Sequence, residues 1–154
     1  TIHVCQLRPK SRGFVRLSDS DPRSAPLIDP CYFSDSDDIR VLREGVKLAR
    51  RVFRTEAFAS IFGGDDLPAT EVVTDEQIDA DIRQRAESIY HPVGTCRMGE
   101  DELAVVDSRL RVRGVSGLRV ADASVMPLLI SGNTNAACMM IGEKAATYVL
   151  EDNA

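Results

Sequence analysis

The spacing of hydrophobic residues predicts a helix over residues 36–56. Apolar side chains recur there every three or four positions, which is the pattern of one buried helix face. They are Ile39, Leu42, Val46, Ala49 and Phe53. Ser36 is the expected N-cap, and Asp37 and Asp38 follow it, where the helix dipole favours negative charge. The last turns carry a basic cluster, which favours a solvated helix end over a phosphate-binding patch. It comprises Lys47, Arg50, Arg51 and Arg54.

Two further helices are expected in the second half of the chain. One runs from Thr74 to about Tyr90, and Gln77 lies three residues after Thr74, as in a capping box. Its inner stripe is Ile78, Ile82, Ala86 and Ile89. The other spans about residues 133–150, and its first half is apolar on every side. A helix of this kind is normally buried all round, which implies a partner surface that the chain itself does not supply.

Short runs of β-forming residues predict strands. Residues 2–7 and 14–17 are expected to form two strands joined by a polar turn. The next loop contains Pro22, Pro26 and Pro30, which argue against regular structure there. Shorter β-like pieces are expected at residues 105–106, 110–112 and 118–121.

Composition indicates a folded chain of ordinary globular type. Of its 154 residues, 44% are apolar and 28% are charged. The formal net charge of -5 argues against a non-specific nucleic-acid binder, which would normally be basic. No secretory signal is visible at the start. The chain instead begins at Thr1 inside a strand-like run, so we expect it to be a piece of something longer.

Four cysteines are separated by long, irregular intervals, at Cys5, Cys31, Cys96 and Cys138. The absence of a Cys-x-x-Cys pair argues against a structural zinc site, and no metal ligands are expected. Few cysteines and no signal suit reduced, buried thiols, so the expected localisation is cytoplasmic.

His91 is the stronger of two histidine candidates for chemistry. Pro92 disfavours helical geometry at His91, and Gly94 and Gly99 allow a close approach of backbone. The pattern is compatible both with a general base and with an ordinary hydrogen-bonded histidine. His3, in the strand-like start, is interpreted as structural.

A second polar cluster, Ser131–Asn135, opens the last predicted helix. We expect one Asn to cap the helix while the other projects, so that the helix N-terminus faces an anion or a polarised carbonyl. A Cys96–His91 nucleophile pair is a weaker alternative, because no third orienting group is evident. No Gly-x-Gly-x-x-Gly turn is present, so the chain carries no dinucleotide fingerprint of its own.

Taken together, these motifs resemble the C-terminal part of the glucose-methanol-choline (GMC) oxidoreductases. The resemblance covers nearly the whole chain and rests on several motifs in the right order. They are Arg8–Gly13, His91–Gly99, Val105–Asp107, Gly117–Pro127, Gly132–Asn135 and Ile141–Ala146.

The resemblance implies an α+β fold, mainly an antiparallel sheet with helices on one face. Residues 1–113 would form the substrate-binding domain, and residues 114–154 would return to the FAD-binding domain. Family members are flavoenzymes that oxidise alcohols with FAD, and the Gly-rich loop for FAD lies in an N-terminal region not present here. The isolated fragment is therefore expected to be inactive.

The resemblance also assigns roles to individual residues. His91 would remove the hydroxyl proton of the alcohol while a hydride passes to flavin N5. Asn133 would donate a hydrogen bond to the developing alkoxide, as in the choline and alcohol dehydrogenase branch. The positions that would line FAD are Asp122, Ala123, Asn135 and Ala136.

Substrate and partners follow from the same resemblance. The expected substrate is a primary alcohol or choline, and the expected electron acceptor is a quinone or oxygen. Peripheral membrane association of the full-length enzyme is a further expectation, and a nucleic-acid partner is not expected. The alternative is a non-catalytic, substrate-domain-like module that docks a partner chain.

Overall fold

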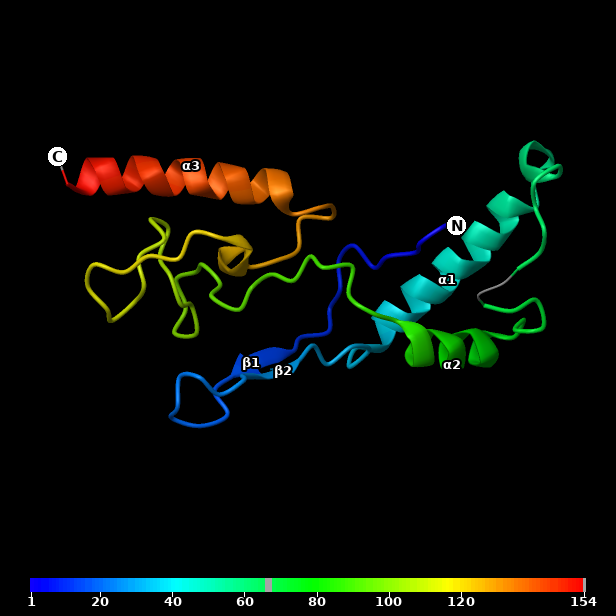
Figure 1. The fold of residues 1–154 in the computed structure, drawn as a ribbon, viewed down its shortest axis with the longest axis horizontal. Coiled ribbons are helices and arrows are strands. Elements are labelled where there is room, and N and C mark those ends of the chain that lie inside the picture. Colours follow the sequence, from blue (N-terminus) through cyan, green and yellow to red (C-terminus); the bar gives the residue numbers. More distant parts are fainter. Residues whose placement is uncertain (66–67, 154) are drawn as a thin grey trace. The chain divides into compact units, whose positions relative to one another are not determined.

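A computed structural model describes residues 1–65 and 68–153. The chain divides into two compact units, Thr1–Ile89 and Tyr90–Ala154. The first unit contains β1 (Phe14–Arg16), β2 (Leu27–Asp29), α1 (Ser36–Phe53), the short 3₁₀ turn η1 (Glu56–Phe58) and α2 (Asp75–Arg85). The second contains a 3₁₀ turn, η2 (Ala123–Val125), and α3 (Asn135–Asp152), and Figure 1 labels the helices and strands. The predicted boundary between residues 113 and 114 concerned domains of a whole enzyme and stays a prediction.

In the first unit, α1 packs against α2 as the hydrophobic pattern predicted (Figure 1). Ile39 of α1 and Ile78 and Ile82 of α2 form a buried cluster. The capping box is confirmed, because Thr74 Oγ1 accepts the backbone N–H of Gln77 while the Gln77 side chain accepts that of Thr74.

Three helix ends differ from the prediction, and one of them is the end of α1, which lies at Phe53 instead of residue 56. Asp35, not Ser36, caps α1, and its Oδ1 accepts the backbone N–H of Asp37 at 2.8 Å. Helix α2 ends at Arg85 rather than near Tyr90, and Ile89 is exposed. The buried residues of α2 are Ile78 and Ile82, whereas Ala86 and Ile89 beyond them are exposed, so burial does not favour a longer helix.

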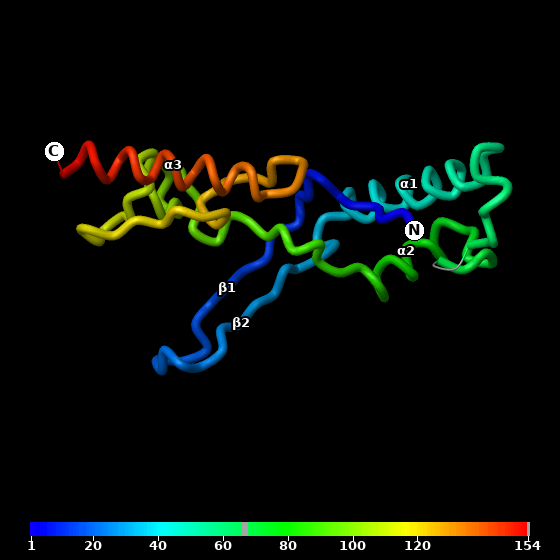
Figure 2. Tube along the Cα trace, turned by 45° about the horizontal axis from the view of Figure 1, so that its top comes forward, coloured from blue at the N-terminus to red at the C-terminus, as the bar shows by residue number. Residues whose placement is uncertain are grey.

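The predicted strand at residues 2–7 is wrong, and the proline-containing loop forms a strand instead. β1 pairs in antiparallel fashion with β2, so that Val15 lies opposite Ile28. Pro26 and Pro30 stand just outside the three-residue strand β2, where a missing N–H does not interrupt the ladder. In both figures of the whole chain the hairpin extends away from α1 and α2 (Figures 1 and 2).

Asp38 explains why the start of the chain is irregular rather than a strand. The residue is 3% exposed, and its carboxylate accepts the backbone N–H groups of Lys10 at 2.9 Å and Ser11 at 2.8 Å. Gln6 Nε2 donates to the same carboxylate at 3.3 Å. Burial alone would raise the pKa of Asp38, but these hydrogen bonds, including that of Ser11, outweigh it and hold the pKa below its ordinary value.

In the basic cluster at the end of α1, Arg50 and Arg54 pair with groups of the chain itself, so this helix end is not simply solvated. Arg50 donates to the carbonyls of Pro68, Ala69 and Val72, at 3.0, 2.8 and 2.5 Å. Arg54 pairs with Asp65 at 2.5 Å. These side chains hold the returning loop against α1, which is a structural role.

The antiparallel content of the fold is smaller than predicted. Within residues 1–65 and 68–153, β1 and β2 form a two-stranded sheet, not a large sheet with helices on one face. The β-like pieces of the second half pair only through isolated bridges, Met98 with Val106, Val106 with Val112 and Arg111 with Arg119. The combination of helices with antiparallel strands is confirmed, and the sheet-dominated architecture is not.

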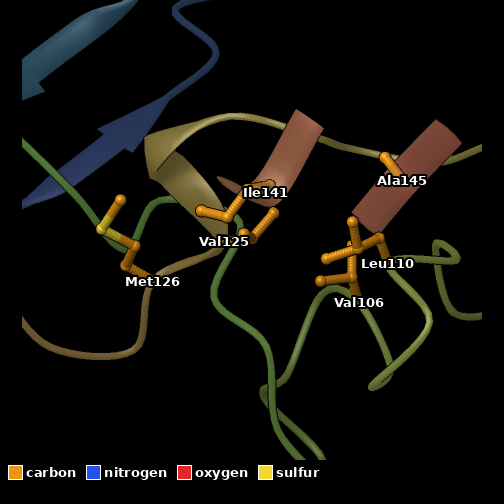
Figure 3. Packing of buried hydrophobic residues seen from close by; sticks show 6 residues of the cluster. All are labelled: Val106, Leu110, Val125, Met126, Ile141 and Ala145. Carbon is orange, nitrogen blue, oxygen red and sulfur yellow. The ribbon is translucent and has the colours of Figure 1, made fainter. Parts of the chain in front are cut away.

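In the second unit, α3 lies along the irregular chain of residues 90–130 (Figures 1 and 2). Figure 3 shows the buried cluster that joins them, in which Ile141 faces Val125 and Ala145 lies beside Leu110 and Val106. Met126 completes the cluster. The core of this unit is therefore built mainly from loop residues packed under one helix.

Helix α3 buries only one of its faces against the described chain. Ile141 and Ala145 are buried, whereas Met139 is 60% exposed and Leu150 is 72% exposed. The remaining apolar face is exposed in the described chain, and its burial against a further partner surface stays a prediction. Across residues 1–65 and 68–153, the helices are too short or too polar to cross a membrane.

Candidate functional site

The loop that carries His91 is held on η2 by backbone hydrogen bonds. Cys96 N donates to Ser124 O at 3.0 Å, and Met98 N donates to Val125 O at 2.8 Å. Gly94 has a φ of +91°, and a Cβ there would lie 3.3 Å from the carbonyl oxygen of Met126. A side chain at residue 94 would be strained, so Gly94 lets the loop turn close to η2.

The turn before α3 brings a second polar segment into the same unit. Thr134 occupies the N-cap position of α3 with helical backbone angles, and its side chain makes no capping hydrogen bond. Its carbonyl accepts the N–H of Cys138 at 2.9 Å, as the first bond of the helix. The expectation that an Asn would cap this helix is therefore wrong.

Thr134 instead contacts His91. The Oγ1 of Thr134 lies 3.2 Å from Nδ1 of His91, across 43 residues of sequence. Thr134 is 8% exposed, and His91 is half-buried. This contact joins the two polar segments that the sequence singled out, and Asn133 is the residue immediately before it.

Two left-handed residues flank this contact. Tyr90, directly before His91, has a φ of +64°, and Ser131, two residues before Asn133, has a φ of +63°. Non-glycine residues in this region of backbone space are uncommon, and they concentrate at functional sites. Ser131 Oγ is also buried and lacks a hydrogen-bond partner within the described chain.

The structure brings the other predicted site residues into the same unit. Asp122 caps η2, and its Oδ1 accepts the N–H of Ser124 at 2.8 Å. Ala123 packs on the same buried cluster as Val93 and Ala137, so η2, the His91 loop and the start of α3 share one core. Asn133, Asn135 and Ala136 are exposed.

One charged pair stiffens the His91 loop farther along. Arg97 Nη1 and Nη2 donate to the two oxygens of Asp101, at 2.8 and 2.5 Å. The guanidinium of Arg97 lowers the pKa of Asp101 to about 2. The pair stays charged at neutral pH and adds no titrating group to the site.

A cysteine nucleophile and a metal site find less support in the geometry. All four cysteines are free and partly buried, and no hydrogen bond joins the Cys96 side chain to His91 in the part of the chain that is described. Within that part, no group of three His, Cys, Asp or Glu residues could hold a metal ion.

The arrangement offers one base and one set of donors. The His91 ring can accept a proton, and its partner Thr134 directly precedes the first N–H groups of α3, which the Thr134 side chain does not cap. Helix N-termini favour negative charge. Thr134 is the site residue that sequence reasoning missed, because a Thr between two Asn residues is indistinguishable from an ordinary cap.

Comparison with known proteins places this geometry in a family context. The C-terminal domain of the GMC oxidoreductases matches residues 9–142. The chain is 50% identical over 150 residues to an alcohol dehydrogenase [acceptor] of Pseudomonas putida, covering 97% of the chain and 27% of that relative. It is 46% identical over 147 residues to an oxygen-dependent choline dehydrogenase of Cronobacter sakazakii, covering 96% of the chain and 26% of that relative. The chain thus spans about a quarter of the length of these curated relatives.

Solved structures are similar over nearly the whole chain. Pyridoxine 4-oxidase from Mesorbium loti superposes with a TM-score of 0.85 at 35% identity, covering 92% of the chain and 28% of that structure. An FAD-dependent oxidoreductase from Chaetomium thermophilum superposes with a TM-score of 0.89 at 31% identity, covering 96% and 26%.

Proposed function

Because the chain belongs to the GMC oxidoreductase family, we propose that it forms about a quarter of an FAD-dependent enzyme that oxidises a primary alcohol or choline. The P. putida relative is named for alcohol oxidation and the C. sakazakii relative for choline oxidation. The electron acceptor is proposed to be a quinone or oxygen. The observation that carries the proposal is the contact between His91 and Thr134, the residue that follows Asn133 in the chain.

His91 is proposed to be the base of this reaction. It removes the proton of the alcohol hydroxyl, which raises electron density on the carbinol carbon and prepares that carbon to lose a hydride. Asn133 donates a hydrogen bond from its side-chain amide to the developing alkoxide. When bound, FAD would supply the hydride acceptor.

The residues around the turn suit such a cofactor. The N-terminus of α3 has no side-chain cap from Thr134, and Asn135 and Ala136 are exposed there. Donors at a helix start stabilise negative charge, which a flavin gains on reduction. The unpartnered Ser131 Oγ is a further polar group in the same turn. Asp122, Ala123, Asn135 and Ala136 would hold the flavin.

Exposed apolar surface supports the proposal that the chain completes a larger molecule. Met139 and Leu150 on α3, and Leu17 and Ile28 around the hairpin, are all exposed. Surfaces of this kind mark interaction sites in soluble proteins. Residues 114–154 are proposed to complete the FAD-binding domain, and residues 1–113 to belong to the substrate-binding domain.

Substituting the proposed base tests this function in the intact flavoprotein. We expect His91→Ala to lower the rate of anaerobic flavin reduction by choline or a primary alcohol by about 10²- to 10⁴-fold, the usual contribution of a positioned base. Flavin absorbance of the purified protein shows whether FAD is retained. His3→Ala is the matched control, because His3 is exposed in the irregular start of the chain. An unchanged reduction rate in His91→Ala would instead favour a non-catalytic docking module.

A further inference from the structure

We propose that Thr134 is a positioning residue that fixes the orientation of the His91 ring. The inference rests on the proposed function, in which His91 is the base. Its observation is the 3.2 Å contact between Thr134 Oγ1 and His91 Nδ1, the hydrogen bond that the imidazole makes in the described part of the chain.

The proposed role of His91 as the base sets the direction of this hydrogen bond. A neutral imidazole carries one N–H and one nitrogen with a free electron pair. Thr134 engages Nδ1, so Nε2 is the nitrogen left to accept a proton from the alcohol. Nε2 can accept only if Nδ1 holds the ring proton, so Nδ1–H donates to the hydroxyl oxygen of Thr134.

The same acceptor also suits the product of the proton transfer. Once Nε2 has taken the alcohol proton, both ring nitrogens carry hydrogen, and Nδ1–H still donates to Thr134 Oγ1. A hydrogen bond from a charged donor is stronger than one from a neutral donor. Thr134 therefore holds the ring in place before the transfer and stabilises the imidazolium after it, without moving.

Thr134 is itself held firmly. It is 8% exposed, and its carbonyl accepts the Cys138 N–H within the first turn of α3. Ile141 and Ala145 anchor that helix in the buried cluster. The hydroxyl leaves its usual capping role at a helix start, where a Thr side chain normally accepts an N–H. Helix α3 therefore lacks a side-chain cap, and the hydroxyl of Thr134 serves instead as a fixed hydrogen-bond partner of the His91 ring.

Two substitutions separate the hydroxyl of Thr134 from its volume. Thr134→Val keeps the branched shape and removes the acceptor, whereas Thr134→Ser keeps the acceptor and removes a methyl group. In the intact holoenzyme, we expect Thr134→Val to lower the limiting rate of flavin reduction by about 10- to 100-fold, the usual cost of losing orientation. Substrate affinity should change little, and Thr134→Ser should recover most of the rate.

The opposite pattern would overturn the inference. If Thr134→Val keeps the wild-type rate, or if Thr134→Ser is as slow as Thr134→Val while both melt at lower temperature, the residue acts only through packing. His91→Ala and the double variant His91→Ala/Thr134→Val complete the cycle. A positioning role predicts that the double variant is no slower than His91→Ala alone, and multiplied losses would contradict it.

This design also distinguishes the two proposals. A wild-type rate in His91→Ala would contradict the proposed function, and with it the proposed role of Thr134. A slow His91→Ala beside a fast Thr134→Val would leave the base in place and remove only the positioning role.

Discussion

At the scale of single residues, two side chains show how one group organises a segment. The Asp38 carboxylate accepts the backbone N–H groups of Lys10 and Ser11 and so holds the start of the chain in an irregular conformation instead of a strand. Thr134 joins the start of α3 to His91. Both residues stand at helix starts, where polar side chains are common, and the tertiary contact of each gives it a specific role.

Asp38→Asn should destabilise the protein. The change removes a charge and replaces one acceptor oxygen with an NH2 donor that faces the buried N–H groups, at a cost of about 1–3 kcal/mol. Thermal or urea unfolding at pH 7 measures the loss. Asp37→Asn, on the same turn but more exposed, is the control and should have a smaller effect. Equal effects of the two changes would contradict the anchoring role of Asp38.

The same residue predicts a pH dependence. The folded-state pKa of Asp38 is lowered, so its stabilisation is present above the unfolded pKa of about 3.9 and is lost as pH falls through the folded value. The stability difference between wild type and Asp38→Asn should therefore be full at pH 7 and shrink below about pH 4. Unfolding of both proteins across this range checks the sign.

At the scale of elements, the helices follow local rules more closely than the strands do. The 3.6-residue pattern and the capping box are local signals, and α1 and α2 begin where these signals predict, although both end earlier. Strand pairing depends on which distant segments come together. β1 pairs with β2, which forms within the predicted loop at a place where the prolines lie just outside the paired residues. The local sequence of a strand does not specify which other segment it pairs with.

Thr74→Ala should loosen α2. The loss of its N-cap hydrogen bond to Gln77 is expected to cost about 1 kcal/mol. Hydrogen exchange of the α2 amides should become about fivefold faster where exchange proceeds by helix opening. Thr74→Ser should behave like wild type, and Thr70→Ala, at an exposed loop position, should leave α2 unchanged. Unaltered exchange in Thr74→Ala would show that packing alone holds the helix.

At the scale of the whole molecule, the chain leaves much apolar surface uncovered. A folded chain of this length normally buries about two thirds of its surface. Here each unit has a small core, and the hairpin and one face of α3 are exposed. The proposal that a larger enzyme covers these faces accounts for their composition.

A charge on the open face of α3 should disturb the intact enzyme. We expect Met139→Lys to lower the melting temperature and the FAD content, because an unpaired charge is costly to bury. Lys144→Ala, at an exposed polar position of the same helix, is the control. Purified protein is compared by thermal unfolding and flavin absorbance. Wild-type values in Met139→Lys would mean that this face stays in water.

Much of the molecule could be predicted from the sequence, for physical reasons that are visible in particular residues. The buried face of α1, the capping box at Thr74 and the non-helical backbone at His91 all depend on neighbours within a few positions. Short-range spacing also identified the two polar segments around His91 and Asn133. The ordered motifs identified the family, which the match over residues 9–142 confirms.

Only the tertiary structure decided which distant groups meet. Three contacts join segments that are far apart in the sequence. The Asp38 carboxylate binds the start of the chain, β1 pairs with β2, and Thr134 contacts His91 across 43 residues. Their partners are chosen by the packing of the whole unit, because a polar side chain can satisfy its hydrogen bonds in several ways that local sequence does not distinguish. Sequence alone thus determined the helices and the candidate residues, and folding determined their partners.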